Sequence, residues 1–280
     1  MLAADAQVAG KRLGIRVDVV FADNNAIQQI HQLYQYVHAP AEERPLAIVV
    51  EAVKGEGMER LARNAAKAGI GWIVQQQGVG YIETLLKEGW RVPIGAVTVD
   101  EREIGRIQAR QFQALLPHGG AVLFLQGPPD SSTTAARLDG LQDALKGSPI
   151  TLKGALHGDW TEQSAKAAVT AWLRLKTSEA TTLDLVGSQN DSMATGARKA
   201  FQELRKECAK VPFTGCDGLP EGGRRQVDSG ELKATIVKPT TTGPALELIA
   251  GTLTGKPFPA ESLLQPCSYP ALEKLAEAKR

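Results

Sequence analysis

Polar side chains suited to binding a small molecule follow an apolar run in the second half of the chain. The apolar residues Leu183, Leu185 and Val186 precede Gly187, and the polar sequence SQND at 188–191 precedes a helical pattern. In open α/β sheets such a strand end lies at the carboxyl edge, where ligands bind. Because the amide of Asn190 offers both a donor and an acceptor to hydroxyl groups, we expect Asn190 to contact a ligand. We expect Asp191 to cap the following helix.

Two further strand ends carry side chains with suitable chemistry. Trp160 lies in the polar loop HGDWTEQSA, and its flat ring suits an apolar face of a small molecule, with core packing as the alternative. Asp217 follows the run VPFTGC, and its carboxylate can accept two hydroxyl groups in charge-assisted hydrogen bonds, with an Asx turn as the alternative. Since parallel strands end at one edge, we expect Trp160, Asn190 and Asp217 to open onto one crevice.

These residues must be positioned by an alternation of strands and helices that runs along the whole chain. The expected strands cover residues 15–23, 46–53, 70–77, 93–100, 119–127, 150–160, 182–190, 211–218 and 232–239, with helical patterns between them. Such spacing indicates βαβ units with parallel sheets. Apolar residues on both faces of several strands indicate that helices cover both sides of each sheet. The pattern also suggests a division of the α/β fold near Asp100.

The QND segment and the order of elements resemble the sugar-binding proteins of bacterial ABC importers, the ribose-binding type of the periplasmic binding protein type I fold. The resemblance extends from roughly Gly10 to Pro266. It implies two Rossmann-like lobes with parallel sheets, joined by a three-crossing hinge. Residues 1–100 plus 239–262 would form lobe one, and residues 101–238 plus 263–280 would form lobe two.

The family begins with a strand placed centrally in its first sheet, and this sequence starts after that strand. We therefore expect the first strand of lobe one to be missing, and we interpret the recorded start as lying inside the natural gene. The segment MLAADAQVAGKRLG has neither the basic region nor the apolar core of a signal peptide. An export signal would then belong to the part of the gene before residue 1.

The resemblance also assigns ligand positions in this sequence. It implies sugar contacts by Trp160, Asn190 and Asp217, and it places Lys238 where the ribose-binding type has a hinge glutamine. We expect Lys238 either to pair with Asp217 or to favour an acidic ligand, with a solvated strand-end lysine as the alternative.

In lobe one, the amides of WIVQQQG replace an Asp-Arg pair of the family. Because a strand points alternate residues the same way, either Gln75 and Gln77 or Gln76 alone would face the ligand.

Two departures from the family pattern indicate a pocket that has diverged from ribose binding. Aligned on Gly140, Arg137 matches the second, mainly structural arginine of the family, and Ala135 replaces the first arginine, which contacts the ligand. We expect Thr134 to reach toward the ligand instead. Cys216 stands where the family often has an aromatic residue before the aspartate.

Composition excludes several other classes. The net charge of +1 gives no electrostatic reason to expect nucleic acid as a partner. The three cysteines are an odd number without metal-ligand spacing, and no phosphate-binding loop, nucleophile elbow or dinucleotide fingerprint is present. We therefore expect no enzyme activity, no cofactor and no metal.

The sequence predicts a solute-binding receptor that closes over a small polar ligand, most simply a carbohydrate, for ABC-type import. Its partners would be that ligand and a membrane permease, and its location would be periplasmic, or cytoplasmic if the recorded start is genuine. The alternative is the ligand-sensing domain of a lac-repressor-type regulator, or a stand-alone sensor, lacking its DNA-binding part.

Overall fold

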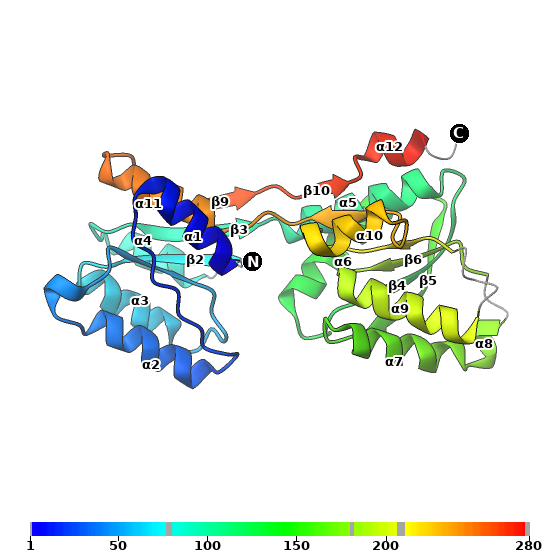
Figure 1. The fold of residues 1–280 in the computed structure, drawn as a ribbon, viewed down its shortest axis with the longest axis horizontal. Coiled ribbons are helices and arrows are strands. Elements are labelled where there is room, and N and C mark those ends of the chain that lie inside the picture. Colours follow the sequence, from blue (N-terminus) through cyan, green and yellow to red (C-terminus); the bar gives the residue numbers. More distant parts are fainter. Residues whose placement is uncertain (1, 77–79, 180–181, 206–210, 278–280) are drawn as a thin grey trace. The chain divides into compact units, whose positions relative to one another are not determined.

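The computed structural model describes residues 2–76, 80–179, 182–205 and 211–277. The chain divides into two compact units (Figure 1). The first contains Met1–Val99 and Pro239–Leu264, and the second contains Asp100–Lys238 and Gln265–Arg280. The α/β class with parallel sheets in two lobes is confirmed. The hinge role of the three crossings stays a prediction.

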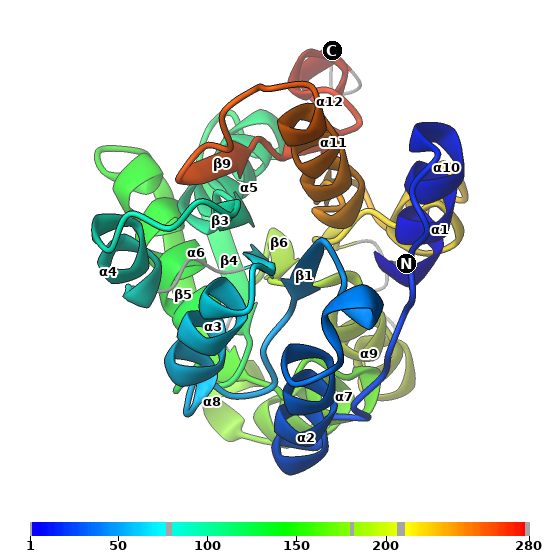
Figure 2. The ribbon, with the colours of Figure 1, turned by 90° about the vertical axis from the view of Figure 1, so that its left-hand side faces the viewer.

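The first unit is a parallel sheet covered by helices on both faces. Its strand order is β1-β2-β3-β9, with β1 Ala47–Val50, β2 Gly71–Gln76, β3 Ile94–Val99 and β9 Glu261–Leu264. Its helices are α1 Leu2–Leu13, α2 Ala26–Val37, η1 Ala41–Glu43, α3 Met58–Lys67, α4 Tyr81–Lys87 and α11 Thr242–Leu253. One face packs on α2, α3 and α4 through side chains such as Trp72, and the other packs on α1 and α11 through Ile73 and Val97 (Figure 2).

The strand predicted at residues 15–23 is wrong. The exposure of this segment alternates from residue 15 to residue 20, yet the segment pairs with no strand. A strand needs a neighbour to satisfy its backbone N–H and C=O groups, and none of the described residues lies in a strand before β1. The alternation of side chains that predicted a strand is therefore observed, but the described residues show no backbone pairing with a neighbouring strand.

The second unit is also a parallel sheet between two helical layers. Its order is β5-β4-β6-β7, with β4 Gly120–Gln126, β5 Ile150–His157, β6 Leu185–Ser188 and β7 Phe213–Thr214. The pair β8 Thr235–Val237 and β10 Cys267–Tyr269 is antiparallel. The helices are α5 Glu101–Leu115, α6 Ser132–Leu145, α7 Glu162–Leu173, α8 Lys176–Glu179, α9 Asp191–Leu204, α10 Arg225–Asp228 and α12 Leu272–Glu277, with a π-turn at Pro220–Arg224. Helices α7 and α9 cover one face, and α5, α6 and α12 cover the other.

Helices α5 and α6 cross at very short range because each has a glycine at the crossing. A Cβ on Gly105 would lie 2.0 Å from the carbonyl oxygen of Arg137, and one on Gly140 would lie 1.9 Å from that of Arg102. Both distances are far below contact, so only glycine fits at either position. This close crossing brings the start of α5 beside Arg137 of α6.

We expect Gly105→Ala to destabilise the second unit by about 1–3 kcal/mol, because the added methyl group forces the two helices apart. Gly55→Ala is the matched control, since a Cβ there meets nothing within 4 Å. Urea unfolding followed by circular dichroism measures both variants. An equal effect of the two substitutions would show that the α5–α6 crossing is not under this steric constraint.

Candidate functional site

Three strand ends of the second unit bring predicted site residues together. Asn190 Nδ2 donates to the carbonyl oxygen of Trp160 at 2.8 Å, and the backbone N–H of Asp191 donates to that of Cys216 at 2.7 Å. The loop after β6 is therefore joined to the loops after β5 and β7. The backbone N–H of Lys238 donates to the carbonyl oxygen of Asp217 at 3.2 Å.

The backbone is strained at three of the predicted residues. Trp160 has φ of 71°, Asp217 has 108° and Gln76 has 73°, whereas residues other than glycine rarely adopt positive φ. Such conformations persist only where the surrounding structure enforces them, and they cluster at ligand sites. The observation therefore supports these positions as candidates without assigning them a ligand.

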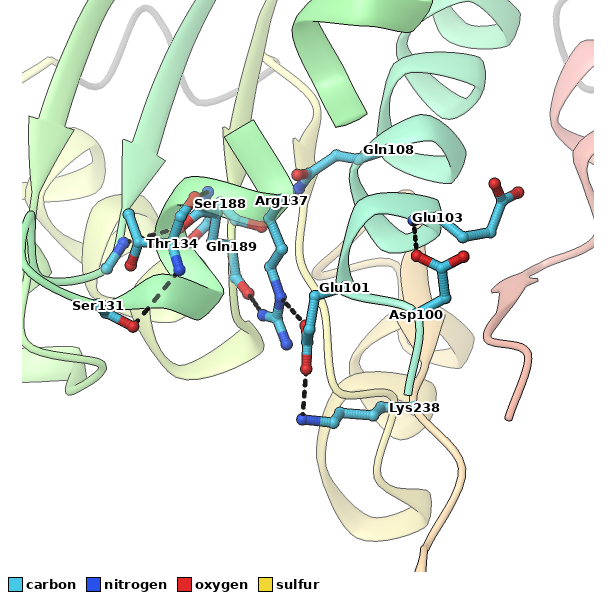
Figure 3. Close-up of polar contacts among 11 residues, drawn as sticks. Asp100, Glu101, Glu103, Gln108, Ser131, Thr134, Arg137, Ser188, Gln189 and Lys238 are labelled. Atoms are coloured by element: carbon cyan, nitrogen blue, oxygen red, sulfur yellow. Dashed lines mark hydrogen bonds and ion pairs between the residues drawn. The ribbon is translucent and has the colours of Figure 1, made fainter. Parts of the chain in front are cut away.

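Arg137 is the buried centre of this edge, with only 3% of its side chain exposed. Its Nε donates to Glu101 Oε2 at 2.7 Å, and its Nη1 donates to the carbonyl oxygen of Gln189 (Figure 3). Its guanidinium carbon lies 5.7 Å from the centroid of the Trp160 ring, a cation–π distance. Trp160 as a whole is half-buried, and it packs against the hydrophobic core that includes residues of α7 and α9.

Glu101 also pairs with Lys238, at 2.9 Å between Oε1 and Nζ, so one carboxylate meets two cations. The side chains of Glu101 and Lys238 are 10% and 19% exposed. Burial raises the pKa of Glu101, but the charges of Arg137 and Lys238 outweigh it, so that pKa lies below its usual range.

The predicted ion pair between Lys238 and Asp217 is wrong. Lys238 reaches the first turn of α5 instead, where Glu101 is held by Arg137. Sequence analysis missed Glu101 because an acidic residue after Asp100 looks like any first-turn residue of a helix.

The carboxylate of Asp217 is the acceptor that remains available. Within the described residues no hydrogen-bond donor or cation reaches it at contact distance, and it lines a cavity of about 170 Å³. Burial raises the pKa of Asp217, opposed by the charges of Arg137 and Lys238. A ligand hydroxyl would supply the donor that this carboxylate lacks.

The prediction that Asp191 caps the helix after β6 is wrong, because Asn190 has that role. Asn190 is the N-cap of α9, because its Oδ1 accepts the N–H of Met193 at 2.8 Å. Asp191 is buried and accepts from Thr235 Oγ1 at 2.7 Å and from the N–H of Gly218 at 2.9 Å. Both polar groups of the Asn190 amide thus have protein partners, so direct ligand contact by Asn190 stays a prediction.

Thr134 lies in the first turn of α6, 3% exposed, and its Oγ1 is buried without a hydrogen-bond partner. Its carbonyl oxygen accepts from Gln189 Nε2 at 3.1 Å. Gln189 also accepts the N–H of Gly127 at 2.9 Å, so this completely buried amide joins β6 to the loop after β4. The structure therefore gives Gln189 a role in joining these segments by hydrogen bonds.

The amides predicted in lobe one lie in the first unit. Gln75 is 9% exposed, and its Oε1 accepts from Thr241 at 3.2 Å and Thr242 at 2.8 Å. Gln76 Nε2 donates to Thr241 Oγ1 at 3.4 Å. Gln77 lies outside the described residues, so which of the three amides would face a ligand stays open.

The described residues contain no cluster of three or more metal-ligating side chains. Cys216 is buried and Cys267 is exposed, both as free thiols, and Cys208 lies outside the described part of the chain. Where the chain is described, none of its helices has the length and apolar character to span a membrane.

The titration of Asp191 predicts a pH dependence of stability. Burial raises its pKa to about 7, although the hydrogen bond from Thr235 opposes the shift. Between the usual Asp pKa of about 3.9 and this value, the folded state holds a proton that the unfolded state has lost. Stability should therefore fall as pH rises through this window.

The test is the urea midpoint measured at intervals from pH 5 to pH 8. We expect Asp191→Asn to flatten this dependence, because the amide has no proton to lose, whereas Asp139→Asn at an exposed position should follow the wild type. An Asp191→Asn profile as steep as that of the wild type would contradict the assignment.

Comparison with known proteins identifies the family. A model described as "Periplasmic binding protein domain" matches residues 2–242. The D-galactose/methyl-galactoside binding periplasmic protein of Haemophilus influenzae is 31% identical over 153 residues, which are 50% of this chain and 44% of that protein. The match thus spans less than half the length of this relative.

Solved structures agree on the fold. A periplasmic solute binding protein of an ABC transporter from Actinobacillus succinogenes, with bound D-allose, has a TM-score of 0.80 at 20% identity, covering 99% of this chain and 93% of that chain. The Caulobacter myo-inositol binding protein has a TM-score of 0.77 at 22% identity, covering 99% and 89%. The resemblance inferred from the sequence is confirmed: the chain belongs to the periplasmic binding protein domain family, with the type I fold of periplasmic sugar-binding proteins.

Proposed function

We propose that this chain is a periplasmic solute receptor that binds one small carbohydrate or polyol and presents it to the permease of an ABC importer. The observation that carries the proposal is the Asp217 carboxylate, which has no donor in the described residues and lines a cavity at the strand-end edge. Trp160 lies at the same edge, joined through Asn190. A carboxylate acceptor and an aromatic ring at one edge of a sheet suit a molecule with hydroxyl groups and an apolar C–H face.

The proposed mechanism is hinge closure. A ligand that binds the closed arrangement of the two units more tightly than the open one shifts the population toward the closed form. No covalent step or cofactor is part of this mechanism. The alternative with the same fold is the ligand-sensing domain of a transcription regulator. Genomic sequence upstream of the chain distinguishes the two functions, since an export signal there indicates a receptor and a DNA-binding motif indicates a regulator.

A thermal-unfolding screen against D-galactose, D-allose, L-arabinose and myo-inositol tests the proposal. A ligand at about 100 times its Kd should add about 2.7 kcal/mol of stability. A screen in which no neutral sugar or polyol stabilises the protein would contradict the proposed function.

We expect Asp217→Ala to weaken binding of the best ligand of this screen by about 100-fold or more. Two charge-assisted hydrogen bonds, at about 1.5–3 kcal/mol each, are lost. The fold should survive, because no described side chain depends on this carboxylate for a hydrogen bond. Isothermal titration calorimetry measures the effect, with Asp139→Ala as the exposed control. Unchanged affinity in Asp217→Ala would show that the ligand site lies elsewhere.

A further inference from the structure

The charged groups at the strand-end edge of the second unit comprise one cluster of ion pairs and the carboxyl groups of Asp191 and Asp217, which have no cation at contact distance in the described residues. Both cations, Arg137 and Lys238, contact the same carboxylate, that of Glu101. The carboxylate of Asp217, unlike that of Asp191, also lacks a hydrogen-bond donor at contact distance among the described residues. Glu101 is buried to about the same degree as its partners, so its charge acts in a medium that screens it weakly.

We propose that Glu101 sets the charge selectivity of the site, so that the receptor accepts uncharged polyhydroxy ligands and rejects anionic ones such as sugar acids. This inference rests on the proposed function and adds the class of ligand that it excludes. The two cations would attract an anion if they were unpaired. Glu101 instead cancels much of their field, and Asp217 adds a negative charge where the ligand is expected.

The arrangement cancels charge without removing hydrogen-bond donors. The ammonium group of Lys238 has three N–H donors, and the ion pair with Glu101 engages one side of it. The other donors can still meet a neutral hydroxyl. An anionic ligand, in contrast, would be placed near the free carboxylate of Asp217 and would have to compete with Glu101 for both cations.

The surroundings of Asp217 add to this bias. The cavity that it lines is also lined by Glu162 and Asp191, so three carboxyl groups face one space. Glu162 is paired with Lys199 at the surface, and Asp191 accepts two protein hydrogen bonds. Among the described residues that line this cavity there is no cation, so the cavity disfavours a carboxylate or phosphate on the ligand.

Substitution Glu101→Gln tests the inference, since the amide keeps the size and one acceptor for Arg137 but removes the negative charge. The measured quantity is a selectivity ratio: the Kd for D-galacturonate or D-glucuronate, by competition, divided by the Kd for the best neutral sugar of the screen. In the wild type this ratio should be at least tenfold. In Glu101→Gln we expect it to narrow by threefold or more at low ionic strength, where screening is weakest.

Two further variants complete the test: one should change the selectivity ratio in the opposite sense, and the other is a control that should leave it unchanged. Lys238→Gln removes a cation and leaves Glu101 in place, so the ratio of the two Kd values should widen rather than narrow. Glu103→Gln removes a carboxylate from the same turn of α5, but Glu103 pairs with Arg106 and Arg110 and lies apart from Arg137 and Lys238 (Figure 3). Its ratio should match the wild type.

The outcomes separate this inference from the proposed function. Suppose that a neutral sugar binds the wild type. The role of Glu101 is then overturned, and the receptor function stands, if the wild-type selectivity ratio is below tenfold or if Glu101→Gln narrows that ratio by less than threefold. The same conclusion follows if Glu103→Gln narrows the ratio as much as Glu101→Gln does. If no neutral sugar binds the wild type, the proposed function fails and this inference fails with it. Should Glu101→Gln not fold, as judged by circular dichroism, the Lys238→Gln ratio decides, and a ratio that does not widen overturns the inference.

Discussion

The burial of the Arg137 guanidinium is the constraint on which the strand-end edge of the second unit depends. A buried charge is tolerated only when it is paired and hydrogen-bonded. Arg137 meets this condition with one contact from each of three segments: Glu101 in α5, the carbonyl oxygen of Gln189 after β6, and the Trp160 ring after β5. Removing a single partner of such a group typically costs about 3–5 kcal/mol. The three segments are therefore held in one arrangement before any ligand arrives.

A second constraint holds the loop after β7. The Asp191 carboxylate accepts from Gly218 and Thr235, and a Cβ on Gly223 would lie 2.0 Å from it, so the loop closes tightly around this group. Asp217, with its positive φ, is one residue before Gly218 in this loop. The strained backbone of Asp217 is thus next to a buried hydrogen bond, and strained conformations persist where the surrounding structure enforces them.

The sequence was informative where structure follows from local pattern, and it failed where structure follows from a distant partner. Strand-helix alternation predicted both parallel sheets, and the polar strand ends predicted that Trp160, Asn190 and Asp217 would lie at one edge of the second. The segment 15–23 has the period of a strand but no neighbour to pair with. Glu101 contacts Arg137 across 36 residues, a separation that no spacing rule detects. Asn190 and Asp191 are adjacent and chemically similar as caps, so only the loop geometry decides between them.

These constraints favour a preorganised half-site. Trp160 is fixed on one face by Arg137, and its ring lies so close to Gly127 that a Cβ there would be 2.1 Å away. Trp160 thus packs partly against the protein, as the alternative interpretation expected. This packing is compatible with a ligand role, because one face of the ring can contact the protein and the other a ligand. A platform held in this way loses little side-chain entropy when a ligand stacks on it. The free energy of binding can then depend on a few directional contacts, and the unpartnered Asp217 carboxylate offers the strongest of them in the described residues.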